Sequence, residues 1–158
     1  LKWKEIAKMY ESRKQAACAI FEGSIVVCGG HNHNNVFNTV ESYDVYCNTW
    51  TTMPSMIEER SDHSLVCVKS KMFAIGGANL YTNCEIFDRT SNKFTTLETP
   101  KFMSYDVNAI TVGSKIFVFQ SYTRDVLCYD VDKNKWPKGS CEAIESIIHY
   151  STVKVPLY

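Results

Sequence analysis

The chain has 158 residues, and its 17 Lys and Arg balance its 17 Asp and Glu, so its formal net charge is zero. Because acidic and basic residues are interspersed, neither nucleic acid nor an anionic membrane is expected as a main partner. No apolar run approaches the roughly 18 residues of a transmembrane helix.

The first predicted element is a β-hairpin that ends in a glycine pair. Its strands are expected at residues 16–21 and 24–28, with Glu22-Gly23 as the turn and Gly29-Gly30 at the end. β-Favouring residues on both sides of a two-residue turn are typical of such a hairpin. The preceding residues 1–12 are interpreted as the end of an earlier repeat, because Trp3 lies 47 positions (50 − 3) before Trp50.

The same pattern then returns twice. A second hairpin is expected at residues 63–68 and 72–75, ending at Gly76-Gly77, and a third at residues 108–112 and 116–119, ending at Gln120-Ser121. Each hairpin precedes a third strand with an aromatic-Asp pair and a fourth strand with an aromatic residue six positions after that Asp. Since no segment has helical periodicity, the sequence predicts an all-β array of four-stranded antiparallel units, each about 42 to 47 residues long, as in the blades of a β-propeller.

The residues that recur in these units are expected to be structural. Glycine permits positive φ and close approach of a neighbouring backbone, Asp caps a turn, and aromatic residues, Trp3 included, pack between blades. The recurring set is Gly29, Gly30, Glu41, Tyr43, Asp44, Trp50, Gly76, Gly77, Glu85, Phe87, Asp88, Phe94, Tyr129, Asp130 and Trp136. Arg13 and Arg60 each lie 16 residues before a glycine pair, and are expected to bind carbonyl groups or the motif carboxylates.

Together, the Gly-Gly pairs, the Glu-x-Tyr-Asp motif and the spaced Trp resemble the kelch repeat, and in detail the kelch domain of the BTB-kelch (kelch-like) family. The resemblance covers residues 3–136. The third copy departs from the pattern, because Gln120-Ser121 replaces Gly-Gly, Ser104 the leading Arg and Leu127 the Glu. The resemblance implies a kelch-type propeller with about three blades present, at residues 13–56, 60–99 and 104–142. Residues 146–156 would be a closing strand or the inner strand of a further blade, and the chain would be the C-terminal part of a larger protein.

The same resemblance implies a protein-recognition module without an active site or cofactor. The propeller would capture a protein target while upstream BTB and BACK domains dimerise and dock a cullin scaffold, which makes the whole a substrate adaptor for ubiquitin ligation. One alternative is a cytoskeletal kelch protein that binds actin. A copper-oxidase-type propeller enzyme is a weaker alternative, because the Tyr and His residues form no set in register with the repeat.

Strand direction predicts which face binds a partner. In an antiparallel meander, the loops between second and third strands and the connections between blades open on one face, and variable loops on a rigid scaffold usually carry function. The predicted contact residues are His31, Asn32, His33, Asn34, Asn35, Glu58, Arg60, Asn79, Tyr81, Tyr122 and Arg124. His31 and His33 have no further ligands at a suitable spacing, so no metal site is expected.

The seven cysteines form an odd set without a Cys-x-x-Cys motif. This usage indicates free thiols in a reducing, cytoplasmic setting. Most are expected to be buried, since Cys18, Cys28 and Cys67 fall on inner strands and Cys84 and Cys128 on third strands. Cys47 and Cys141 lie in loops, where a redox-sensing role is a minor alternative.

Overall fold

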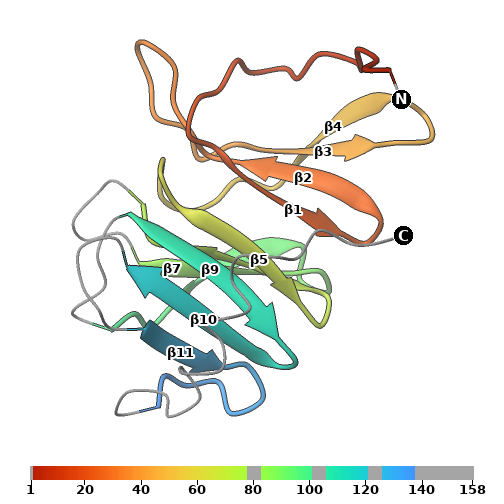
Figure 1. The fold of residues 1–158 in the computed structure, drawn as a ribbon. Helices are drawn as coiled ribbons and strands as arrows, with labels where there is room; N and C mark the ends of the chain where they lie inside the picture. The colour runs from red at the N-terminus through yellow and green to blue at the C-terminus, as the bar shows by residue number, and fades with distance from the viewer. Residues whose placement is uncertain (1, 78–82, 101–105, 121–125, 138–158) are drawn as a thin grey trace.

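A computed structural model describes residues 2–77, 83–100, 106–120 and 126–137 of the chain (Figure 1). Within these ranges the chain forms eleven strands in three antiparallel sheets. The first sheet, blade 1, contains β1 (Ala17–Phe21), β2 (Ser24–Cys28), β3 (Val40–Asp44) and β4 (Thr49–Met53); blade 2 contains β5 (Ser64–Val68), β6 (Lys71–Ile75), β7 (Cys84–Asp88) and β8 (Lys93–Leu97); blade 3 contains β9 (Val107–Val112), β10 (Lys115–Gln120) and β11 (Val126–Asp130). The predicted hairpins, their two-residue turns and the third strands are thereby confirmed.

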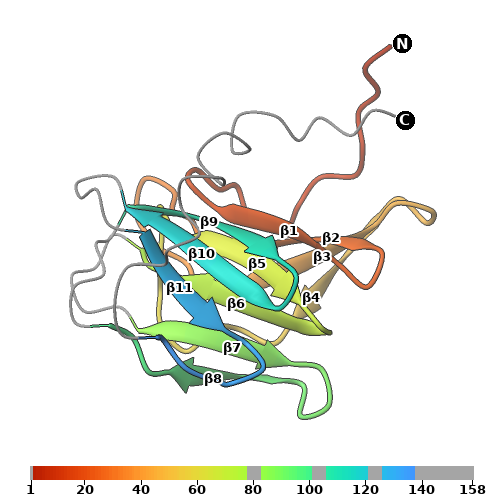
Figure 2. The ribbon, with the colours of Figure 1, turned by 60° about the horizontal axis from the view of Figure 1, so that its bottom comes forward.

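The three blades pack face to face about their first strands. In each sheet the strands follow one another in chain order, and β1, β5 and β9 lie side by side (Figure 2). The figure shows the later strands of each blade extending away from this inner row. The arrangement is that of successive blades of a propeller.

Alternation along the strands of blade 2 divides their side chains between two inter-blade cores. Phe21 and Val26 of blade 1 pack with Met72 and Phe87 of blade 2. On the other face of blade 2, Phe73 joins a second cluster, which also contains Ile116 and Tyr129 of blade 3. A blade with an apolar layer on both faces needs a neighbour on each side, which explains why the strands read as nearly continuous apolar runs.

Blade 1 has a neighbouring blade on only one of its faces within the described residues. On the other face, Ile20 is 73% exposed and Cys18 is also exposed. Leu65 and Cys67 take the corresponding places 47 residues later (65 − 18 and 67 − 20) and pack on blade 1. The expected burial of Cys18 is therefore wrong here, whereas Cys28, Cys84 and Cys128 are buried and Cys67 is half-buried.

Residues 2–12 form no strand, and part of this segment covers the outer half of that same face. The Trp50 Nε1 donates to the Ala7 carbonyl at 2.8 Å, and the Tyr10 hydroxyl donates to the Trp50 carbonyl at 2.7 Å. Trp3 does not take part, because it is fully exposed, which corrects its expected packing between blades. Trp50 and Phe94 are buried as expected.

Blade 3 shows only the beginning of its predicted fourth strand. Asp130 and Lys135 exchange both backbone hydrogen bonds, at 3.0 and 3.3 Å, and the Trp136 ring packs at a tilt against Tyr129. Pro137 follows at the position of Thr51 in β4 and Thr95 in β8, one residue after the aromatic residue. Proline has no N–H for a ladder, which explains why regular pairing does not continue through it. The rest of the predicted unit 104–142, and the tail 146–156, lie outside the described residues.

The third-to-fourth turns are capped as predicted. The Asp44 carboxylate accepts the amides of Tyr46 and Cys47 at 2.8 and 3.0 Å. Asp88 accepts the amides of Thr90 and Ser91 in the same way, and Asp130 accepts that of Lys133. These hydrogen bonds stabilise the charged carboxylates, so the pKa of each of the three Asp side chains lies below its ordinary value.

Candidate protein-binding face

The glycine pair after β2 allows the backbone to pass close to two other segments of the chain, at Lys14 and at Arg60. Gly29 and Gly30 have φ of +61° and +83°, a region that side chains other than glycine enter at a cost. A Cβ on Gly29 would lie 2.4 Å from the Arg60 carbonyl oxygen, and one on Gly30 would lie 2.6 Å from that of Lys14. The pair therefore acts as scaffold, as predicted for it.

Arg13 holds both ends of the loop at residues 31–39. Its guanidinium donates to the carbonyls of Gly29 and Thr39 at 2.8 and 3.1 Å and to the Glu41 carboxylate at 2.7 Å. Glu41 also accepts the amides of Tyr10 and Glu11, at 2.7 and 3.2 Å. One buried ion pair thus fixes the loop and the connection that enters blade 1.

The same device recurs in blade 2. Arg60 donates to the carbonyls of Gly76 and Asn83, each at 2.8 Å, and to Glu85 at 2.5 Å. Glu85 in turn accepts the amides of Ile57 and Glu58 at 2.7 and 3.0 Å. The expectation that Arg13 and Arg60 bind carbonyls or the motif carboxylates is confirmed, since each binds both. The predicted placement of Arg60 on the binding face is wrong, because Arg60 is only 1% exposed and its guanidinium is paired with the buried Glu85 carboxylate.

Local hydrogen bonds give the loop at residues 31–39 a defined shape. The Asn32 side-chain oxygen accepts the amides of Asn34 and Asn35, both at 2.9 Å. His31 pairs with Lys14 through both backbone hydrogen bonds, and its Nε2 lies 2.5 Å from Gln15 Oε1. An Asn that bonds amides two and three residues ahead is a standard turn former.

The loop is also attached to the connection between blades 1 and 2. The Phe37 carbonyl accepts the Arg60 amide at 3.1 Å. The Asn38 carbonyl accepts the Met56 amide at 2.9 Å, and the Asn38 side chain donates to the Met56 carbonyl at 3.1 Å. Loop 31–39 and residues 56–60 therefore form one continuous, internally bonded surface, which we call the loop face.

The predicted contact residues differ in their exposure on this face. His33, Asn34 and Asn35 are exposed, and His31, Asn32 and Glu58 are half-buried. Asn79, Tyr81, Tyr122 and Arg124 lie outside the described residues. The loops therefore present His33, Asn34 and Asn35 to solvent while they use His31 and Asn32 partly for their own structure.

Two apolar residues of the loop face were not among the predicted contacts. Val36 is 41% exposed and Ile57 is 55% exposed, and the bonds from Phe37 to Arg60 and from Asn38 to Met56 bring their loops together. In the sequence, each belongs to an apolar pair in an otherwise polar loop, Val36-Phe37 and Met56-Ile57, and this is the signal that would have found them. Exposed apolar side chains beside amide groups are typical of protein contacts.

Beneath the loop face, Cys28 and His63 meet between blades 1 and 2. Their Sγ and Nε2 atoms lie 3.2 Å apart in a buried environment. Burial raises the pKa of the Cys28 thiol to about 12 and, together with the nearby Arg60 charge, lowers the pKa of His63 to about 3. Both groups are neutral near pH 7, so this contact is part of the core.

These blades and their buried Arg–Glu pairs define a class, the β-propellers built from four-stranded repeats. The solved structure described as "Structure of YjhT" has this fold, with a TM-score of 0.74 and 18% sequence identity over 90% of this chain and 56% of that one. The family model described as "Kelch motif" matches residues 12–57, which span blade 1. Blade 1 is therefore a kelch repeat, and the chain is similar to a fragment of a kelch-repeat protein.

Curated proteins with similar sequences fall into more than one group. Kelch-like protein 7 of Rattus norvegicus is 35% identical over 120 residues, which cover 71% of this chain and 20% of that protein. Kelch-like protein 40 of Xenopus tropicalis is 35% identical over 75 residues, or 48% of this chain and 12% of that protein. Alpha-scruin of Limulus polyphemus is 26% identical over 87% of this chain and 17% of its own length. The chain thus spans about a fifth or less of the length of these relatives. In the ranges that the structure describes, no helix is long and apolar enough to span a membrane.

Proposed function

We propose that this chain is the target-recognition part of a kelch-repeat adaptor, and that the loop face is where it binds a protein target. The single observation that carries the proposal is the construction of this face. Two loops with exposed amide, imidazole and apolar side chains are held on a rigid base by the Arg13–Glu41 and Arg60–Glu85 pairs. A face that is ordered before binding loses less conformational entropy when a partner docks.

We further propose that capture of the target leads to its ubiquitination. Similarity to kelch-like proteins favours an adaptor that presents its target to a cullin-type ubiquitin ligase through BTB and BACK domains elsewhere in the protein. This chain would then contribute recognition, and its partners would contribute the chemistry. The likeness to alpha-scruin extends along more of the chain, so an actin-binding protein is kept as the second candidate.

Charged substitutions at the two exposed apolar residues test the binding face. The full protein carrying Val36→Asp and Ile57→Asp is compared with unchanged protein in affinity capture with quantitative mass spectrometry. Val45→Asp and Tyr46→Asp form the matched control, because these residues are 48% and 94% exposed in the third-to-fourth turn of blade 1, at the ends of the strands opposite the loop face. We expect the first pair to deplete the captured target and the control pair to retain it. Equal capture by both variants would exclude the loop face.

The two candidate roles are separated by what is captured. The adaptor role predicts a cullin in the capture that both variants retain, and ubiquitination of the target that Val36→Asp with Ile57→Asp abolishes. The alternative predicts that the protein sediments with purified actin filaments and that the same two substitutions weaken this. If the capture contains no cullin while actin binding depends on the loop face, the adaptor role is wrong.

A further inference from the structure

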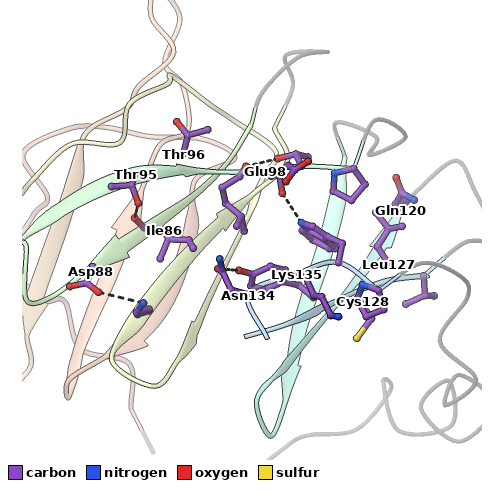
Figure 3. Close-up of a pocket in the computed structure, with 18 residues that line it drawn as sticks. Ile86, Asp88, Thr95, Thr96, Glu98, Gln120, Leu127, Cys128, Asn134 and Lys135 are labelled. Carbon is purple, nitrogen blue, oxygen red and sulfur yellow. Dashed lines mark hydrogen bonds and ion pairs between the residues drawn. The ribbon is translucent and has the colours of Figure 1, made fainter. Parts of the chain in front are cut away.

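A second candidate site lies between the outer strands of blades 2 and 3. A cavity of about 940 Å³ opens there (Figure 3), with β7 and β8 on one side and β11 with residues 134–137 on the other. Its volume falls within the roughly 300–1,000 Å³ of sites that hold ligands. Its walls are the facing sides of two blades, whereas the loop face is built from the first loop and the connection between blades 1 and 2.

A residue at which the third repeat departs from the pattern, Leu127, forms part of one wall of this cavity. Between blades 1 and 2, the Glu85 carboxylate occupies the corresponding position and binds Arg60 and two amides. In blade 3 this position is Leu127, which lines the cavity, and Ser104 stands in the sequence where the Arg would be. The motif Glu that lies in an ion pair at the junction of blades 1 and 2 is thus replaced by an apolar residue at the next junction.

The residues that line the cavity suit a ligand that is neutral as a whole and apolar at its centre. The apolar surface of the cavity comes from Ile86, Leu97, Leu127 and the Trp136 ring. The Trp136 Nε1 donates to the Glu98 carbonyl at 2.7 Å. Charged groups of both signs sit near the ends of the strands. Lys71 is paired with Asp88 at 3.5 Å and Lys135 follows β11, while Glu98 follows β8 at its other end. Opposite signs at opposite ends do not favour a strongly charged ligand.

The β8 strand adds hydrogen-bonding capacity along one wall. It is the last strand of its sheet, and no described strand pairs with its outer edge. Its Thr95 and Thr96 are exposed and line the cavity. Because Asp130 and Lys135 exchange both hydrogen bonds, the aligned pair Asp88 and Lys93 is expected to do the same. Alternation along an antiparallel ladder then turns the Thr96 N–H outward.

We propose that this cavity and the β8 edge together form a peptide-binding site at the side of the propeller. An extended segment of a partner protein would add to β8 by backbone hydrogen bonds and insert one bulky apolar side chain between Ile86, Leu127 and Trp136. Main-chain pairing supplies affinity and the pocket supplies specificity in this mode of recognition. The site is separate from the loop face, so the two can bind different segments.

Two substitutions remove the two parts of the site independently. Leu127→Trp fills the cavity, and Thr96→Pro removes the outward N–H of β8 at an edge position, where proline is tolerated. Thr52→Pro is the matched control, because Thr52 faces Glu41 in β4 as Thr96 faces Glu85 in β8. Thermal unfolding of each variant shows that the fold is retained.

The probe is a library of short random peptides displayed on phage and selected on the full protein. A selected peptide is then synthesised with a fluorescent label for anisotropy titrations. We expect selected peptides to share one large apolar residue, and their Kd to rise about tenfold or more with Leu127→Trp and with Thr96→Pro. With Thr52→Pro the Kd should stay within about twofold of its original value. The proposal is overturned if no peptide is enriched, or if the enriched peptides bind both site variants as they bind the unchanged protein. Either result leaves the loop face untouched, because that face is tested by substitutions at Val36 and Ile57.

Discussion

Arg60 and Glu85 form an ion pair of 2.5 Å whose side chains are 0% and 1% exposed. Glu85 holds the amides of Ile57 and Glu58 in the same place, so the pair joins the connection between blades to the third strand of blade 2. A buried ion pair is costly to break from one side, because the remaining charge is left without compensation. The loop face therefore depends on two side chains that are buried beneath it.

Glu85→Ala should destabilise the protein by about 3–5 kcal/mol, since it leaves the buried Arg60 charge without its carboxylate and the amides of Ile57 and Glu58 without an acceptor. Urea denaturation measures the change. The double variant Arg60→Ser with Glu85→Leu copies Ser104 and Leu127 of the third repeat and removes both charges, so it should cost less than Glu85→Ala alone. A loss below about 1 kcal/mol for the single variant would show that the pair contributes little.

Two glycines with similar backbone conformation should respond differently to alanine. Gly29 and Gly113 have φ of +61° and +59°, but a Cβ on Gly29 would meet the Arg60 carbonyl at 2.4 Å, and one on Gly113 would meet nothing within 4 Å. Gly113→Ala should cost about 1–2 kcal/mol from the backbone conformation alone. Gly29→Ala should cost clearly more, because Arg60 and the loop must also shift. Equal losses of stability in urea would contradict the close approach.

The Trp50 side chain should contribute far more to stability than that of Trp3. Trp50 is buried and donates to the Ala7 carbonyl, so Trp50→Ala should cost about 3–5 kcal/mol. Trp3 is fully exposed, and Trp3→Ala should change the free energy of unfolding by less than about 0.5 kcal/mol. A loss below about 1 kcal/mol for Trp50→Ala would mean that the repeat register is wrong.

Stability should decrease as the pH falls below the ordinary pKa of histidine. His63 has a pKa of about 3 in the folded protein, whereas the ordinary pKa of histidine is 6.5, so the unfolded chain binds a proton in this pH range and the folded protein does not. The stabilisation is complete above about pH 6.5 and is lost progressively as the pH falls towards 3. Between pH 6.5 and 5 the loss should be about 2 kcal/mol.

His63→Val removes this titration and serves as the comparison. Val107 stands 44 residues after His63, the spacing that separates Gly76 from Gln120, so the third repeat already carries Val at this position. Urea unfolding at the two pH values should show a much smaller pH dependence for the variant. The three capping Asp carboxylates, whose pKa values are lowered, lose their contribution only at still lower pH. An unchanged pH dependence in His63→Val would exclude His63 as its source.

The sequence predicted the architecture well because the signals repeat. Gly29 and Gly76, Glu41 and Glu85, and the spaced aromatic residues hold one register, so each copy supports the assignment of the next. The predicted third strands coincide with β3, β7 and β11. The recurring Arg and Glu also predicted an ion pair between them, since opposite charges form strong hydrogen bonds.

What the sequence did not predict depends on packing between repeats. Arg60 was expected both to bind the motif Glu and to contact a partner, and burial of its side chain rules out the second role. Cys18 lies on an inner strand but on the face of blade 1 that no described blade covers. The cavity beside Leu127 depends on how far two blades diverge, which a one-dimensional pattern does not contain.

The most direct test of the loop face replaces residues 31–39 of the full protein with a short Gly/Ser turn. Thermal unfolding first verifies that the propeller remains folded. Capture of the protein target is then compared with that of unchanged protein and of the Val45→Asp, Tyr46→Asp control. We expect the loop replacement to lose the target while the control retains it. Full retention of the target by the folded loop replacement would show that the loop face does not recognise the partner.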